Sequence, residues 1–205
     1  MPIFQRRPNP PTYANYRAYK PLLRQDFRNL CAYCLLHEGD EGAGGFHAFQ
    51  IDHFRPVEHF PKLEVVYSNL YYSCHWCNRA KWDTWPSPEE QARDFRFVDP
   101  CAEDFYKDHA RLDTSTGKLG ALSPPGDYTI REIRLNRRIF NDLRRNRIGA
   151  QEQIQQVKIK LNQLKREAVP KSELISALEH RIRLLDERYI NPKVPYEPHE
   201  LLVEE

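Results

Sequence analysis

Long apolar runs are missing from this sequence of 205 residues, and their absence limits where the protein can act. No stretch approaches the run of about 18 apolar residues that a membrane-spanning helix needs. The opening residues, Met-Pro-Ile-Phe-Gln-Arg-Arg, begin no apolar stretch of signal-peptide length. No internal repeat is visible either. We therefore expect a soluble, cytoplasmic protein with no membrane partner.

A large excess of charge is also lacking, since 31 Lys and Arg stand against 29 Asp and Glu. The charges are nevertheless unevenly distributed. Residues 131–147 contain seven arginines, one glutamate and one aspartate, whereas residues 191–205 contain one lysine and four glutamates. The basic segment is suited either to a phosphate backbone or to an ordinary solvated helix face, and the acidic tail is unsuited to nucleic acid.

Apolar periodicity and proline positions predict an α+β protein. The expected divisions are an N-terminal arm and helix (1–30), a compact core (31–90), an irregular connection (91–128) and a largely helical region with an antiparallel helix hairpin and the acidic tail (129–205). Strands are expected at 46–54, 65–67 and near 95–98, and helices at 127–143, 154–164 and 174–189.

Five cysteines, an odd number, include two Cys-x-x-Cys pairs: Cys31 with Cys34, and Cys74 with Cys77. Four thiolates around one ion form the tetrahedral site that structural Zn²⁺ prefers, with no position left for water. The alternative is two unrelated pairs of buried thiols. A redox role is disfavoured because no βαβ pattern surrounds either pair. Cys101 is left over, and we expect a free thiol there.

A second group of polar residues, which are not cysteines, lies between and directly after these two pairs. Asp52 and His53 form an Asp-His dipeptide near the end of a predicted strand closed by Pro56, Asn69 precedes the second cysteine pair, and Asn78 follows it directly. In this order, across about fifty residues, the pattern resembles the HNH endonuclease family in its four-cysteine, zinc-stabilised form. The resemblance implies a small ββα-metal core with structural zinc.

The resemblance also implies a role for each residue. His53 is the general base, Asp52 and Asn78 hold a catalytic Mg²⁺ or Mn²⁺, and Asn69 fixes the loop that presents the histidine. Imidazole suits a base at neutral pH, and oxygen ligands suit these cations. Arg79 and Lys81 are expected to contact DNA phosphate.

Two features complicate this assignment. Many relatives have histidine where this chain has Asn78, which leaves Asp52 as the one anionic ligand that can be named. Neighbouring strand residues also point to opposite faces, so Asp52 and His53 can share a site only where the strand bends.

A wider similarity includes the proline-rich arm and the segment Leu135-Asn136-Arg137-Arg138. It resembles the HNH partners of ATPase-linked, Septu-type and retron-associated anti-phage systems, which implies a hetero-oligomer with an ATPase subunit. The expected function is DNA hydrolysis by this nuclease subunit in antiviral defence. The alternatives are a non-catalytic zinc module that binds DNA or the ATPase, and a nuclease that acts on RNA. An intact Asp52–His53–Asn78 cluster would favour the enzyme, and a buried His53 bonded to backbone would favour the module.

Overall fold

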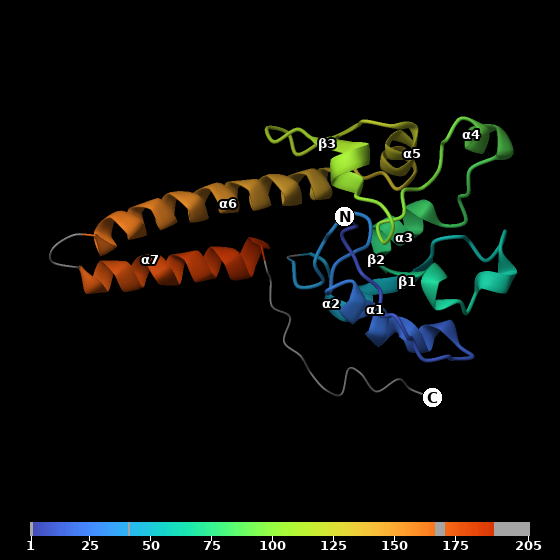
Figure 1. Cartoon of the computed structure of the whole chain (residues 1–205), viewed down its shortest axis with the longest axis horizontal. Coiled ribbons are helices and arrows are strands. Elements are labelled where there is room, and N and C mark those ends of the chain that lie inside the picture. Colours follow the sequence, from blue (N-terminus) through green and yellow to red (C-terminus); the bar gives the residue numbers. More distant parts are fainter. Residues whose placement is uncertain (1, 41, 167–170, 191–205) are drawn as a thin grey trace.

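The computed structural model describes residues 2–40, 42–166 and 171–190, which form helices and two small antiparallel sheets (Figure 1). The helices are α1 (Lys20–Asp26), α2 (Gly45–Ala48), α3 (His75–Lys81), α4 (Pro88–Ala92), α5 (Pro124–Glu132), α6 (Arg138–Lys165) and α7 (Ser172–Leu185), and the strands are β1 (Phe49–His53), β2 (Leu70–Cys74), β3 (Ala110–Leu112) and β4 (Leu119–Ala121). The predicted α+β class is confirmed. Over the described residues, no helix is both long and apolar enough to cross a membrane. The acidic residues 191–205 lie outside the described part.

β1, β2 and α3 form the core unit of the first half. The strands pair antiparallel, with Asp52 opposite Tyr71 and His53 opposite Leu70, and α3 follows β2 without a loop. The prediction of a strand at 65–67 is wrong. A 3₁₀ turn forms at Tyr67–Asn69, and the strand that pairs with β1 is β2, which begins after this turn. That turn brings the Asn69 side chain back to the backbone of Arg55.

Aromatic packing around β2 builds the hydrophobic core. All five residues of β2 are buried, and the ring centroid of Tyr71 lies 5.6 Å from that of Phe27, which directly follows α1. The proline-rich arm joins this core through Phe4, which is 1% exposed. Tyr71 donates a hydrogen bond to Asp99 Oδ1 over 2.7 Å. Burial raises the pKa of the Tyr71 phenol, which therefore keeps the proton that it donates.

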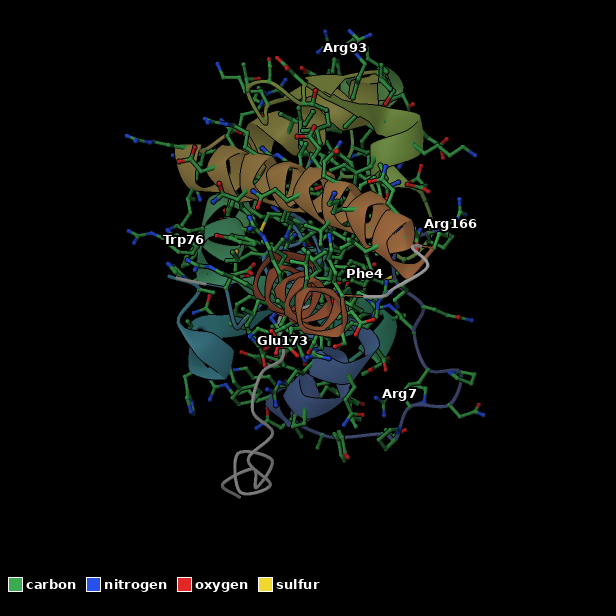
Figure 2. All side chains as sticks on the ribbon, turned by 90° about the vertical axis from the view of Figure 1, so that its left-hand side faces the viewer. Phe4, Arg7, Trp76, Arg93, Arg166 and Glu173 are labelled. Carbon is green, nitrogen blue, oxygen red and sulfur yellow. The ribbon has the colours of Figure 1, made fainter. Side chains whose placement is uncertain are left out.

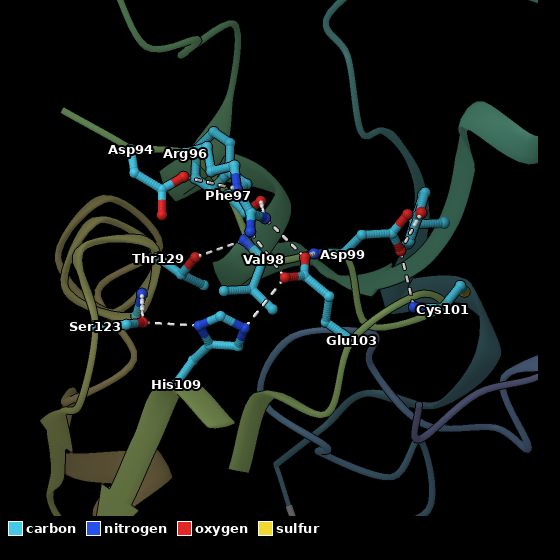
Figure 3. A network of polar contacts seen from close by, with 12 residues as sticks. Asp94, Arg96, Phe97, Val98, Asp99, Cys101, Glu103, His109, Ser123 and Thr129 are labelled. Carbon is cyan, nitrogen blue, oxygen red and sulfur yellow. Dashed lines mark hydrogen bonds and ion pairs between the residues drawn. The ribbon is translucent and has the colours of Figure 1, made fainter. Parts of the chain in front are cut away.

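A polar network holds the irregular segment that follows α4 (Figure 3). Arg96 binds both carboxylate oxygens of Glu103, over 2.7 and 2.8 Å, and Glu103 Oε2 also contacts His109 Nε2 over 3.1 Å. The other ring nitrogen of His109 lies 2.7 Å from Ser123 Oγ. Because Ser123 Oγ also accepts the Gly126 backbone N–H, this network is fastened to the first turn of α5. Residues 95–98, predicted as a strand, form none; they contribute the Arg96 side chain and the Val98 backbone N–H to this network.

The helix predicted over 127–143 is divided between α5 and α6. The break lies at Arg134, whose φ is 56°, and it places Asn136 beside β4. There the Asn136 side chain accepts the Leu119 backbone N–H over 2.8 Å and donates to the Leu119 carbonyl over 2.9 Å. The break thus results from a tertiary contact, since neither proline nor glycine interrupts the sequence between α5 and α6.

α6 has 28 residues and is therefore about 42 Å long. α7 runs antiparallel alongside its outer part, and the pair projects away from the body (Figure 1). Figure 2 looks along the pair from its far end, where Arg166 and Glu173 lie. Apolar residues of the outer part of α6 are buried, namely Ile154, Leu161 and Leu164. Phe140, near the start of α6, belongs to the main core.

Candidate functional site

The four paired cysteines meet in one buried cluster. Their sulfur atoms all lie within 4.8 Å of one another, and Cys34 Sγ and Cys74 Sγ are 3.7 Å apart. A tetrahedral Zn²⁺ with Zn–S bonds of about 2.3 Å places its sulfurs roughly 3.8 Å apart. The donor set and the spacing therefore fit a structural zinc ion. Cys101 lies outside this cluster, and burial raises the pKa of its thiol to about 11.

Two arginines of the basic segment bind the backbone next to these cysteines. Arg137 Nη1 donates to the Trp76 carbonyl, inside the second pair, over 2.9 Å. Arg147 Nη1 donates to the Leu35 carbonyl, next to the first pair, over 2.8 Å, and its Nη2 lies 3.0 Å from Asp40 Oδ2. Arg137, just before α6, and Arg147, within it, thus bind both segments that carry the cysteines, and these two side chains are engaged within the protein.

Arg144, which lies between these two arginines in the sequence, is buried. It donates to the carbonyls of Gly117 and Leu135, while its Nη1 is buried without a hydrogen-bond partner. Burial lowers the pKa of the guanidinium, although interactions with Tyr106, Cys34 and Cys77 act in the opposite direction. A Zn²⁺ ion bound by the four thiolates would carry two net negative charges, and the Arg144 guanidinium would offset part of that charge.

His53, Asp52 and Asn78 line a second site, a surface hollow of about 370 Å³ beside the end of β1 and α3. His53 is half-buried, and its Nε2 lies 2.9 Å from the Glu64 carbonyl oxygen. A carbonyl oxygen only accepts hydrogen bonds, so Nε2 carries the proton and Nδ1 of the neutral ring keeps its lone pair. The Tyr16 ring packs edge-on against the imidazole, with centroids 4.8 Å apart.

Asp52 lies deeper in the same site and is 3% exposed. Its two oxygens lie 3.1 and 3.2 Å from Lys81 Nζ, and Oδ2 also accepts the Tyr33 hydroxyl hydrogen. Burial raises the pKa of the Asp52 carboxyl, although Lys81 and Tyr33 act in the opposite direction. Of about four lone-pair sites on a carboxylate, three are occupied, which leaves about one for a cation.

Lys81 is fully buried, which differs from the expected contact with DNA phosphate. Its Nζ also donates to the His53 carbonyl over 2.6 Å. Lys81 lies three residues after Asn78 on α3, so both face the end of β1, whereas Arg79 is exposed. In this structure Lys81 is therefore a support for Asp52 and for the end of the strand.

The Asn78 side chain is held by Gln50, a residue that no sequence motif indicated. Its Nδ2 donates to Gln50 Oε1 over 2.7 Å, so its Oδ1 is the atom left for a cation. Gln50 precedes Asp52 by two positions on β1, a spacing that indicates the same strand face but no particular partner.

The Asn69 side chain stabilises the loop between β1 and β2 through hydrogen bonds to its backbone. Its Oδ1 accepts the Arg55 backbone N–H over 2.9 Å, and its Nδ2 donates to the carbonyls of Arg55 and Leu63 over 3.0 and 3.3 Å. Leu63 directly precedes Glu64, and the Glu64 carbonyl is the group that binds the His53 ring. The contacts of Asn69 are those of a residue that orients this loop.

Residues 31–84 match the family model described as HNH endonuclease. No curated protein and no solved structure matches the chain. The matched segment begins at Cys31 and includes all four clustered cysteines as well as His53 and Asn78. Residues 31–84 are thus an HNH endonuclease domain with a four-cysteine cluster.

Proposed function

We propose that this chain is a metal-dependent endonuclease that hydrolyses DNA phosphodiester bonds, with His53 as the general base. One observation carries the proposal. The Glu64 carbonyl holds the proton on Nε2 of His53, which leaves Nδ1 as the basic nitrogen, and His53 lines a hollow together with Asp52 and Asn78. A general base needs this combination of fixed tautomer and access to water.

In this reaction His53 removes a proton from the attacking water. Asn78 Oδ1 and the remaining lone pair of Asp52 are hard oxygen donors, which suit Mg²⁺ or Mn²⁺. Such a cation, when bound, would stabilise the negative charge that develops on the phosphate and on the leaving oxygen. Because Lys81 already balances the charge of Asp52, DNA phosphate is expected to contribute to holding the cation.

The zinc ion proposed for the four cysteines has a structural role. It would join the loop after α1 to the start of α3, the helix that carries Asn78. The four cysteines would thereby fix the start of α3 relative to the loop after α1, without touching the substrate.

For a partner, we propose the ATPase subunit of an anti-phage complex, on the family resemblance described above. The α6–α7 hairpin supports a protein partner, because Ile159 on α6 and Leu174 and Leu184 on α7 are between 42% and 53% exposed. Copurification of the chain with a coexpressed ATPase from such a system, lost when these three residues are changed to serine, tests this part.

A non-catalytic zinc module that binds DNA or the ATPase is the second candidate. The ion pair between Lys81 and Asp52 favours it, because a neutralised carboxylate attracts a cation weakly. The backbone bond of His53 was expected for such a module, but that bond engages one ring nitrogen only, and His53 also lines the hollow.

Nicking of supercoiled plasmid in Mg²⁺ or Mn²⁺ distinguishes the two candidates. The wild type is compared with His53→Ala and with His47→Ala, an exposed histidine of the same domain, after zinc content has been measured in all three. Metal-dependent nicking by the wild type and His47→Ala that is lost in His53→Ala supports the endonuclease. Equal nicking by all three contradicts the assignment of His53. An RNA substrate in parallel tests the remaining alternative.

A further inference from the structure

A tight turn follows α3 at the edge of the candidate active site. The Thr84 backbone N–H donates to the Lys81 carbonyl over 2.8 Å, and Trp82 between them has φ 46° and ψ −123°. These are the angles of the first central residue of a type II′ turn, where glycine is the usual residue because a side chain is strained there. Strained residues of this kind concentrate at functional sites.

Trp82 contributes little to the core that the turn adjoins. Its side chain is 72% exposed, the highest value among the large apolar residues described. Trp85, three residues later, packs instead against Phe54 and Phe60, with ring centroids 6.2 and 5.1 Å apart. Packing therefore explains a tryptophan at position 85 and does not explain one at position 82.

The turn is nevertheless held firmly from both sides. The Lys81 side chain is buried on Asp52, and the Asp83 carbonyl lies 3.1 Å from His59 Nε2, on the loop that follows β1. Trp82 is thus an exposed aromatic side chain on a turn that these contacts hold in place. It lines the same hollow as His53 and Asn78.

We propose that Trp82 stacks on an unpaired nucleobase next to the phosphate that the domain cleaves, and thereby directs it to single-stranded or locally opened DNA. This inference rests on the proposed function. An indole face stacks on any base, so the preference is for DNA form with little dependence on sequence. In an intact duplex each base is covered by its neighbours, and the ring has no free base face to meet.

Binding of oligothymidine and of a duplex of equal length, measured by fluorescence anisotropy, tests the proposal. All proteins carry His53→Ala so that the DNA stays intact. Adding Trp82→Gly is expected to weaken oligothymidine binding about tenfold, the usual order for losing one stacked base, and to change duplex binding by less than about twofold. Trp82→Phe should restore most of the loss. Leu122→Ala, which removes another exposed apolar side chain, serves as the matched control.

The thermal midpoint separates stacking from a structural role. Glycine suits the turn, so Trp82→Gly should unfold at the same temperature or a higher one. A lower midpoint, unchanged oligothymidine binding, or no DNA binding at all would overturn the inference. Trp82-dependent binding without any nicking by the wild type would reject the nuclease proposal alone. If the wild type nicks DNA but Trp82→Gly leaves oligothymidine binding unchanged, the role of Trp82 is rejected and the nuclease proposal stands.

Discussion

The buried Lys81 ammonium lies 3.1 Å from Asp52 Oδ2 and 2.6 Å from the His53 carbonyl oxygen, so one side chain supports two neighbouring residues of the candidate active site. Removing Lys81 would leave the Asp52 carboxylate buried without its cation.

Lys81→Met is therefore expected to lower the free energy of unfolding by about 3–5 kcal/mol, the usual cost of breaking a buried ion pair. Urea denaturation followed by circular dichroism measures this loss. Lys62→Met, at an exposed lysine of the same domain, should change the value by less than about 0.5 kcal/mol. Unchanged stability of Lys81→Met together with weaker DNA binding would instead make Lys81 a phosphate contact.

The four-cysteine cluster makes a prediction about metal content. The wild type should contain about one zinc ion per chain, and Cys34→Ser should contain none and lose its folded structure, because the free energy of zinc binding contributes to folding. Cys101→Ser should keep both, since Cys101 lies outside the cluster. Elemental analysis and circular dichroism check this prediction. Full zinc content in Cys34→Ser would contradict the four-cysteine site.

Arg147 and Arg145 differ by two positions on α6 but have different environments. Arg147 binds Leu35 and Asp40, whereas Arg145 is 56% exposed beside Asp142. Arg147→Gln should cost about 2 kcal/mol of unfolding free energy, the order of a hydrogen bond to a charged group, and should speed zinc loss to a chelator. Arg145→Gln should leave both nearly unchanged. Equal effects would contradict the role of Arg147 at the cysteine loop.

Glu103 predicts how stability depends on pH. Hydrogen bonds from Arg96 hold the pKa of this carboxyl below its ordinary value of 4.5. The unfolded chain therefore binds the proton more readily. The contribution of Glu103 to stability is present above pH 4.5 and is lost as the pH falls through the lower folded-state value. The urea concentration at the midpoint of unfolding, measured above and below pH 4.5, should fall more steeply with decreasing pH for the wild type than for Glu103→Gln. Parallel curves would contradict this link.

Much of the candidate site was predictable because its residues occur at characteristic spacings within a short segment. Two Cys-x-x-Cys pairs already define a tetrahedral donor set, and Asp-His followed by Asn69 and Asn78 defines the order of a known domain. The buried role of Lys81 was not predictable in the same way. A lysine near a helix end is ordinarily solvated, and here the end of β1 offers it a carboxylate and a carbonyl.

The chemistry of individual side chains and their local spacing were thus decided by the sequence itself: four thiols that suit zinc, an imidazole that suits the proposed base, and helical periodicity in the last third. Contacts between distant segments were decided by the tertiary structure alone. Asn136 bonds Leu119 between α5 and α6, and Arg147 bonds Leu35. The turn at Trp82 is held by the contacts of Lys81 with Asp52 and of Asp83 with His59. The physical reason is that burial and hydrogen bonding across long sequence separations outweigh local propensities of a few tenths of a kcal/mol to about 1 kcal/mol per residue.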